Sequence, residues 1–308
     1  MGSVMQYPRN EKQIMKNIAI GDVRVSRIEE MLGPAMAPQA FFREYSDAEF
    51  KEHEHWLAPN FYQAETGKLI ASNHSWLLHT GRHVVLIDSC SGNHKPRPEM
   101  ARYDMLNTSD LENLKAAGVQ PEEIDFVLCT HLHVDHVGWN TRLENGRWVP
   151  TFRNAKHVMS RVEHDFWCAK ARDPATQQTL KNVYNDSVLP VVENGMAVMF
   201  DNGYSLDDCL TVVPAPGHTP GHVRIDLRSK EQSAIFCGDV LHNPVQVPLW
   251  HWNTVFCDNP TQAKQSRHDV LSLCAESGAL LMPMHFGQPH AARVKAKNST
   301  FSVDFKYE

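Results

Sequence analysis

The sequence predicts an α+β fold in which β-sheets pack together and helices cover them. Apolar segments of strand length come in runs along the chain, and amphipathic helical segments separate some of these runs. A length of 308 residues and a hydrophobic content of 42% allow a sizeable core in one large domain or two small ones. There is no internal repeat and no low-complexity segment.

Strand patterns dominate the first part of the chain. Residues 18–28 partly alternate apolar and polar side chains, as a half-buried strand does. Residues 76–79 and 84–88 are predicted to be two strands joined by a short hairpin turn that contains glycine. Residues 31–66 are rich in Met, Pro, Phe and Trp without a clean period, and we expect an irregular excursion there.

A helix and a buried strand are predicted next. Ser109 and Glu112 have the spacing of a capping box, and Gly118 suits the C-terminal end of the same helix. The apolar run 124–128 has the length and composition of a buried strand.

The rest of the chain continues the alternation of helices and strands. A helix at 174–192 lies within a predicted helical insertion at 161–195, and a second helix runs from Asn259-Pro260 to Gly278. Further strands are predicted at 210–213, 223–227, 234–237, 279–284 and 294–305.

An H-x-H-x-D-H cluster follows the buried strand directly. It places four metal-competent side chains within six residues: His131, His133, Asp135 and His136. Imidazole and carboxylate groups are costly to bury unless something pairs with them. A strand end that carries them predicts a site for a borderline metal such as zinc, which prefers His nitrogen and carboxylate oxygen.

Three other predicted strands also end in a metal-competent side chain. His218 lies in P-G-H-T-P-G-H, Asp239 lies in C-G-D, and His285 lies in M-H-F. Asp88 ends another strand, where it either fixes the second ring nitrogen of a ligating histidine or simply begins a turn. His222, the last residue of the P-G-H-T-P-G-H motif, is expected to play a structural or supporting part.

With these four motifs in this order, the chain resembles the metallo-β-lactamase superfamily of hydrolases from about Ile18 onward. The resemblance implies an αββα sandwich, with two mixed β-sheets flanked by helices and metals at the sheet edge. It also implies a single domain over residues 18–308, after a flexible N-terminus at residues 1–17. The implied ligands are His131, His133 and His218 for one metal, Asp135, His136 and His285 for a second, and Asp239 as the bridge.

The implied cofactors are two divalent metal ions, of which Zn²⁺ fits the ligands best. Iron, manganese or cobalt would also fit. Two such ions about 3.5–4 Å apart share a water and lower its pKa, so that a bridging hydroxide attacks the substrate. Asp135 would orient this nucleophile and take its proton.

Two positions narrow the branch of the superfamily. Flavodiiron oxidoreductases have Glu at the position of His133, so the chain resembles the hydrolases. Quorum-quenching lactonases have a catalytic Tyr where this chain has His242, and His242 followed by Val245-Gln246 resembles the methyl parathion hydrolase branch. His242 is predicted to contact a substrate oxygen or protonate a leaving group, with a passive place at the site rim as the alternative.

We therefore predict hydrolysis of an ester or lactone bond in a small, partly apolar substrate. The alternatives are a phosphotriester hydrolase and a glyoxalase II-like thioesterase or mononuclear iron sulfur dioxygenase. Aromatic and polar residues near the ligands in sequence predict the substrate cleft: Trp139, Trp250, His251, Trp252 and Phe286. Residues 31–66, with Phe41 and Phe42, are predicted to form a lid or a homodimer contact.

Charge and cysteine content exclude several other classes. A net charge of −6 opposes nucleic-acid binding, which needs a basic surface. No apolar stretch is long enough to span a membrane, and no signal peptide is evident. The seven Cys are widely spaced, so we expect no disulfides and a cytoplasmic location. The expected partner is a small-molecule substrate.

Overall fold

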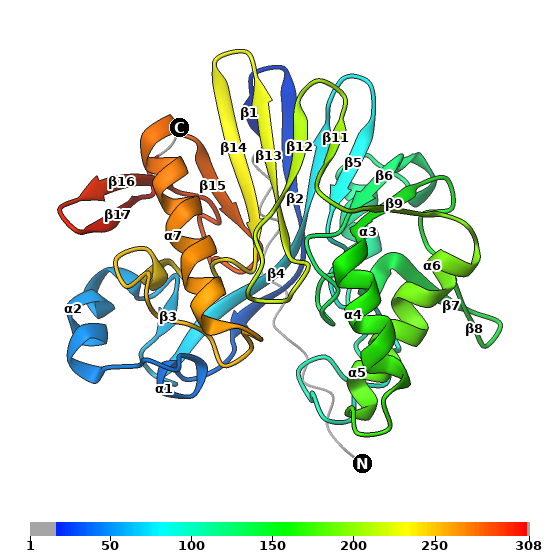
Figure 1. The fold of residues 1–308 in the computed structure, drawn as a ribbon, viewed down its shortest axis with the longest axis horizontal. Coiled ribbons are helices and arrows are strands. Elements are labelled where there is room, and N and C mark those ends of the chain that lie inside the picture. The colour runs from blue at the N-terminus through cyan, green and yellow to red at the C-terminus, as the bar shows by residue number, and fades with distance from the viewer. Residues whose placement is uncertain (1–16, 307–308) are drawn as a thin grey trace.

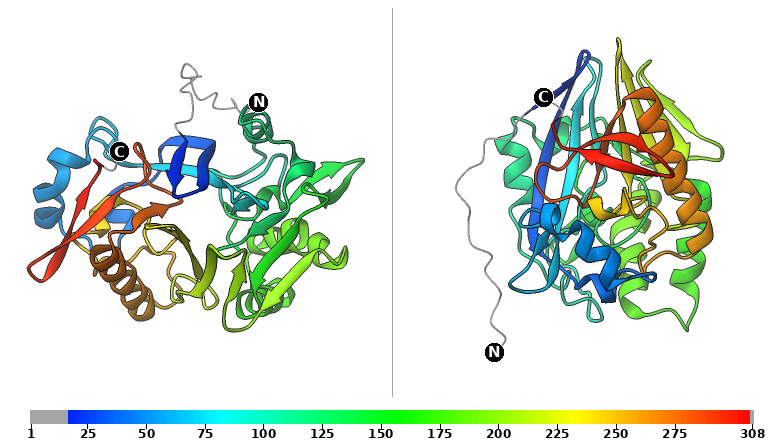
Figure 2. Two further views of the ribbon diagram at one scale, coloured as in Figure 1. Left: turned by 90° about the horizontal axis from the view of Figure 1, so that it is seen from above. Right: turned by 90° about the vertical axis from the view of Figure 1, so that its left-hand side faces the viewer.

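The computed structural model describes residues 17–306, with two β-sheets packed face to face at its centre (Figure 1). The predicted flexible N-terminus at 1–17 lies outside the described residues, except for Asn17. The first sheet has the order β1-β2-β4-β5-β6-β9-β10, with β3 paired to β4, and the second has the order β11-β12-β13-β14-β15. Helices lie on the outer sides of both sheets, as Figure 2 shows from two further directions.

Both sheets are mixed, as predicted. In the first sheet, β1, β2, β4 and β5 pair antiparallel, whereas β5, β6, β9 and β10 pair parallel. In the second, only β14 and β15 are parallel. The bounds in the first sheet are β1 (Ile18–Ile20), β2 (Val23–Pro34), β3 (Tyr62–Gln63), β4 (Lys68–His79), β5 (Val84–Ile87), β6 (Phe126–Leu128), β9 (Lys156–Ser160) and β10 (Ala197–Phe200).

The second sheet and two separate hairpins complete the strands. The second sheet holds β11 (Tyr204–Leu206), β12 (Leu210–Pro214), β13 (Val223–Ser229), β14 (Gln232–Gly238) and β15 (Leu280–Pro283). The hairpins are β7 (Thr141–Glu144) with β8 (Arg147–Pro150), and β16 (Arg293–Lys297) with β17 (Thr300–Asp304).

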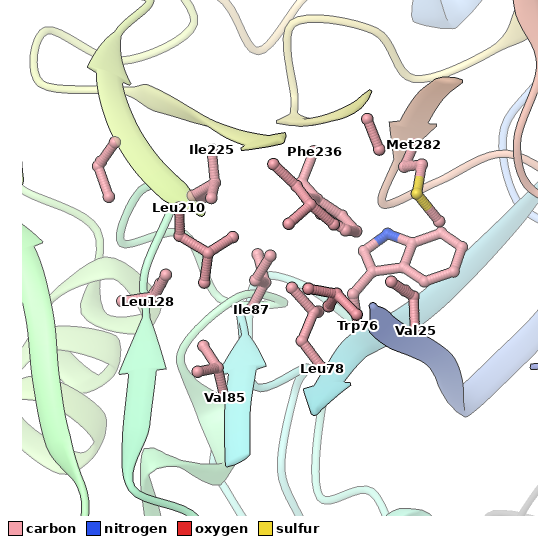
Figure 3. Close-up of a cluster of buried hydrophobic side chains, with 14 of the residues drawn as sticks. Val25, Trp76, Leu78, Val85, Ile87, Leu128, Leu210, Ile225, Phe236 and Met282 are labelled. Carbon is pink, nitrogen blue, oxygen red and sulfur yellow. The ribbon is translucent and has the colours of Figure 1, made fainter. Parts of the chain in front are cut away.

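The main core lies between the two sheets (Figure 3). Trp76 from β4 packs against Phe236 from β14 with ring centroids 5.9 Å apart, and Ile225 and Met282 are fully buried beside them. The indole nitrogen of Trp76 donates to the Pro283 carbonyl at 3.3 Å, so its polar atom is satisfied inside the core. Each large apolar side chain buried here contributes roughly 1.5–3 kcal/mol, which holds the sheets together.

Local sequence signals explain the longest helix, α7 (Pro260–Ser277). The Asn259 side chain accepts from Gln262 N at 3.1 Å, and Pro260 occupies the first turn, where no backbone donor is needed. Gly278 ends the helix with φ +69°, a conformation that glycine adopts without strain. Both predicted ends are confirmed.

The other helices pack on both sides of the sandwich: two of them contact the first sheet, and another joins the core beneath α7. They are α1 (Pro38–Phe41), α2 (Asp47–Leu57), α3 (Asp110–Ala116), α4 (Arg161–Arg172), α5 (Gln178–Val183) and α6 (Leu189–Glu193), with a π turn (Tyr184–Val188) between the last two. The prediction of a capping box at α3 is wrong. Ser109 has φ −100° and ψ +28° rather than extended geometry, so its side chain makes no cap hydrogen bond.

Three further element predictions need correction. Residues 18–28 form parts of two strands rather than one, because Gly21 takes φ +58° and turns the chain between β1 and β2. Residues 31–66 are not irregular throughout, because Ser46 caps α2 and this helix buries Phe50 and Leu57 on one face in a mostly polar sequence. Residues 294–305 form two strands rather than one, since Asn298 takes φ +51° and turns the chain between β16 and β17.

No helix within residues 17–306 has the length and apolar character needed to cross a membrane. All seven cysteines are free, which agrees with the expectation of no disulfide framework. The cytoplasmic location stays a prediction.

Candidate metal centre

Four loops at strand ends bring the predicted metal ligands together from both sheets. The H-x-H-x-D-H segment follows β6 of the first sheet. His218 lies between β12 and β13, Asp239 follows β14, and His285 follows β15, all in the second sheet. The site therefore lies where strands of both sheets end.

The seven side chains form two groups. Within each group the potential ligand atoms lie within 4.8 Å of one another. The groups are His131, His133, His218 and Asp239, and Asp135, His136 and His285. These are the two sets that the sequence motifs predicted, although their role as ligands stays a prediction.

The Asp239 carboxylate lies between the two groups. Its Oδ2 atom is 3.1 Å from His218 Nε2 and 3.6 Å from His131 Nε2. Its Oδ1 atom is 3.0 Å from His285 Nε2 and 3.2 Å from His136 Nε2. One oxygen faces each group, which is the arrangement that a bridging carboxylate requires.

The donor atoms fit a pair of divalent cations. His136 Nε2 and Asp239 Oδ1 are buried, yet neither has a hydrogen-bond partner of acceptable geometry within residues 17–306. His133 Nδ1 lies 2.9 Å from both His131 Nε2 and His218 Nε2, so three ring nitrogens converge on one point. Burial and the His218 ring lower the pKa of His133 to about 3. Burial also lowers the pKa of His218, but the Asp239 carboxylate outweighs it and raises that pKa to about 9. Cations would satisfy these otherwise costly buried atoms.

A family model for the metallo-beta-lactamase superfamily matches residues 71–285, a span that includes all seven side chains. The chain belongs to the metallo-beta-lactamase superfamily. This confirms the predicted family and fold and, at the level of the family, the prediction of a metal-dependent hydrolase.

Known proteins resemble this member of the superfamily in sequence and in structure. It is 26% identical over 183 residues to an N-acyl homoserine lactonase AttM of Azorhizobium caulinodans, covering 56% of this chain and 62% of that protein. The chain therefore spans about three fifths of this curated relative. The hydrolase AbOPH superposes with a TM-score of 0.78 at 24% identity, covering 95% of this chain and 98% of the other. The dizinc quorum-quenching lactonase AidC superposes with a TM-score of 0.74 at 21% identity, covering 94% of this chain and 96% of the other. Likenesses at these identities establish the fold.

Asp88 supports His136, one of the metal-competent histidines, from behind. Its Oδ2 atom lies 2.8 Å from His136 Nδ1 and accepts from Thr130 Oγ1 at 2.7 Å, while its Oδ1 accepts from Thr130 N at 2.7 Å. Asp88 is fully buried, so it orients the imidazole of His136 with its Nε2 toward the centre. Of the two interpretations of Asp88, the structure favours the supporting one.

Replacing Asp88 by asparagine is expected to weaken metal binding about 10–100-fold, because the carboxylate that fixes His136 would lose its charge. Competition with a chromophoric chelator measures this affinity. Asp125→Asn is the matched control, since within residues 17–306 the Asp125 carboxylate accepts a hydrogen bond only from a backbone group, Val84 N at 2.8 Å. Equal metal affinity in the two variants would refute the supporting role of Asp88.

Glu163 is a supporting residue that the sequence did not reveal. This buried side chain of α4 accepts from Leu132 N at 3.1 Å and from Gly221 N at 2.9 Å, and Trp167 Nε1 donates to it at 2.7 Å. Burial raises the pKa of Glu163, and these donors oppose the shift. Glu163 thus ties the H-x-H-x-D-H loop to the loop that carries His218.

His222 lies beside Asp239 rather than within either group of metal-competent side chains. Its Nε2 accepts from Asp239 N at 3.0 Å, as expected for a supporting residue. A Cβ on Gly238 would lie 2.8 Å from His222 Nε2 and from Thr130 Oγ1, and Gly238 has φ +49°. Glycine is therefore required at this position.

His242 lies beside the metal-competent side chains, and both its predicted contact with substrate and its passive alternative stay predictions. Its Nε2 is 3.1 Å from Asp239 Oδ2, and Gln246 Oε1 accepts from its backbone N at 2.8 Å. Burial lowers the pKa of His242 to about 4, although the Asp239 carboxylate opposes this shift. A neutral imidazole at this place can donate a hydrogen bond to an oxygen atom.

Three of the predicted cleft residues are held in the interior. Trp139 donates from Nε1 to Glu30 Oε1 at 2.8 Å, and its side chain belongs to the core outside the first sheet. Trp252 and Phe286 are fully buried in the core beneath α7. Packing explains these three residues without a substrate, since sequence proximity to a ligand does not decide which way a side chain points.

The other two predicted cleft residues lie nearer the surface. Trp250 packs against His268 of α7 with ring centroids 4.7 Å apart. His251 Nε2 is 3.7 Å from Glu49 of α2. The structure thus does not gather the five predicted cleft residues around the seven metal-competent side chains.

Aromatic side chains from two other segments do reach the centre. The Phe41 ring lies 5.5 Å from the His242 ring and 5.8 Å from the Phe256 ring, measured between centroids. A β-bridge between Phe42 and Thr254 holds these segments together. Phe256 is 46% exposed, so an apolar wall beside His242 faces solvent. Part of the 31–66 excursion therefore borders the site, while its role as a lid or as a homodimer contact stays a prediction.

Proposed function

We propose that this protein is a dinuclear metallo-hydrolase that opens the ester bond of a lactone in a small, partly apolar substrate, with Zn²⁺ as the metal. The observation that carries the proposal is the Asp239 carboxylate, with one oxygen toward each group of histidines. The lactonase relative favours a lactone over the phosphotriester, thioester and iron dioxygenase alternatives.

A bound pair of divalent ions would lower the pKa of a shared water and polarise the substrate oxygen. Asp135 Oδ1 lies 3.8 Å from His136 Nε2, and its Oδ2 lies 3.7 Å from His285 Nε2. From this place Asp135 would orient the attacking water and accept its proton. His242 Nε2, which faces Asp239 Oδ2 at 3.1 Å, would turn from that oxygen to donate a hydrogen bond to the substrate oxygen. Phe41 and Phe256 would contact the apolar part of the substrate.

Proton release at fixed pH from metal-loaded protein tests the proposal. The panel contains lactones, aryl and alkyl esters, a thioester and an aryl phosphotriester, each repeated after chelation. Chelator-sensitive turnover that is fastest with lactones supports the proposal. Preference for the phosphotriester would replace it, and oxygen uptake with a single iron per chain would reject hydrolysis at a dinuclear site.

His242→Ala is expected to lower kcat for lactones about 10²-fold or more, because a positioned hydrogen-bond donor at the reacting oxygen would be lost. Steady-state kinetics with equal metal loading measure the effect. His251→Ala is the matched control. The His251 imidazole lies in the same loop region but faces Glu49, so the kcat of this variant should stay near the wild-type value. Unchanged kcat in His242→Ala would place that residue outside the catalytic machinery.

A further inference from the structure

Tyr103 contacts the metal centre although nothing in the sequence marked it. Its hydroxyl donates to Asp135 Oδ2 at 2.9 Å. Tyr103 lies in the long loop between β5 and α3, and 32 residues separate it from Asp135 in the sequence. The function proposed above gives this phenol no part.

The hydrogen bonds around Asp135 distinguish its two oxygens. Besides Tyr103, Asn73 Nδ2 from β4 donates to the same Oδ2 atom at 3.1 Å. A carboxylate oxygen has two lone pairs, so these two donors occupy Oδ2. Oδ1 lies 3.8 Å from His136 Nε2, and Oδ2 lies 3.7 Å from His285 Nε2, so both oxygens are near the second group. Because the two donors already occupy Oδ2, Oδ1 is the oxygen left for a metal.

The loop that carries Tyr103 is fixed at its base. Arg97 donates to both carboxylate oxygens of Asp186, at 2.7 and 2.8 Å, and both side chains are buried. Asp104 Oδ1 accepts from Arg97 N at 2.6 Å, next to Tyr103. The phenol is therefore presented by an anchored loop, and its position costs little conformational entropy on metal binding.

We propose that Tyr103 is a positioning residue which, together with Asn73, holds Asp135 as a ligand through one oxygen only. This inference rests on the proposed dinuclear function. The two hydrogen bonds set the direction of Oδ1 and prevent the carboxylate from turning both oxygens toward the metal held by Asp135, His136 and His285. Tyr103 thus controls the affinity and coordination of that second metal.

Tyr103→Phe tests the inference, because it removes only the hydroxyl. Metal content is measured by elemental analysis after dialysis against graded chelator, and coordination by the visible absorption of the Co²⁺-loaded protein. We expect the more weakly held metal to be lost at about 10–100-fold lower chelator concentration, and the cobalt bands to shift. Asn73→Ala removes the other donor to Asp135 Oδ2, which comes from strand β4 rather than from a loop, and it should also weaken retention of this metal.

Tyr45→Phe is the matched control, since the Tyr45 hydroxyl donates at 3.2 Å to an exposed carboxylate, that of Asp47. It should keep wild-type metal retention and cobalt bands. Wild-type metal retention and cobalt bands in Tyr103→Phe would overturn the inference, whatever substrate the enzyme prefers. If elemental analysis found that the wild-type protein never binds two metals, the proposed dinuclear function would be wrong, and this inference would fall with it.

Discussion

Replacing Asp239 by alanine is expected to remove metal binding and hydrolytic activity together. Among residues 17–306, Asp239 is the one side chain with an oxygen within 3.2 Å of a histidine nitrogen in each group. Without it, the two groups lose their shared negative charge and their link. Bound metal stabilises the transition state by several kcal/mol. Losing this stabilisation would lower kcat/KM about a thousandfold or more.

Elemental analysis and proton-release kinetics on the same preparation measure both quantities for Asp239→Ala. The control is Asp304→Ala, because Asp304 is paired with Lys295 at 2.7 Å on the exposed hairpin β16–β17. That variant should retain metal and rate. If Asp239→Ala kept both its metal content and its rate, Asp239 would not bridge the two groups.

Replacing Asp186 by alanine is expected to lower the free energy of unfolding by about 3–5 kcal/mol, because it leaves buried cations without their counter-charge. Arg97 and Lys95 are both fully buried, and both face this single carboxylate. Burial lowers the pKa of Lys95 to about 7, although Asp186 opposes this shift, so Lys95 can lose its proton. The Arg97 guanidinium cannot lose its proton, so in Asp186→Ala it would stay charged and buried without a counter-charge, which accounts for most of the destabilisation.

Urea unfolding of the metal-free protein measures this destabilisation without a contribution from bound ions. Asp201→Ala is the matched control, since its ion pair with Arg161 at 3.0 Å is largely exposed. Exposed ion pairs contribute little, so this variant should unfold near the wild-type urea concentration. The same unfolding free energy for both variants would show that Asp186 does not compensate the buried cations.

The metal-competent side chains were predictable because their signals are local. His131, His133, Asp135 and His136 follow one apolar strand within six residues, and His218, Asp239 and His285 each follow another. Strands in packed sheets end at common edges, so residues placed just after them are brought together. The ends of α7 were predictable for the same reason, since Asn259 and Gly278 act on the adjacent turn of backbone.

The surroundings of the site were not predictable in this way. Burial and partner choice depend on segments far apart in the chain, as in the contact of Phe41 with Phe256 beside His242. Trp252 lies near site residues in sequence, yet it is fully buried, because its direction is set by core packing rather than by proximity.

By itself, the sequence determined the fold class, the superfamily and the two sets of metal-competent residues, since short motifs at strand ends encode each of these. Only the tertiary structure decided what supports them: Glu163 between two ligand loops, Asp88 behind His136, and Tyr103 on Asp135. These hydrogen bonds join residues that are 31 to 58 positions apart. A single tyrosine, glutamate or aspartate carries no signal of its partner until packing has excluded water and left one donor facing one acceptor.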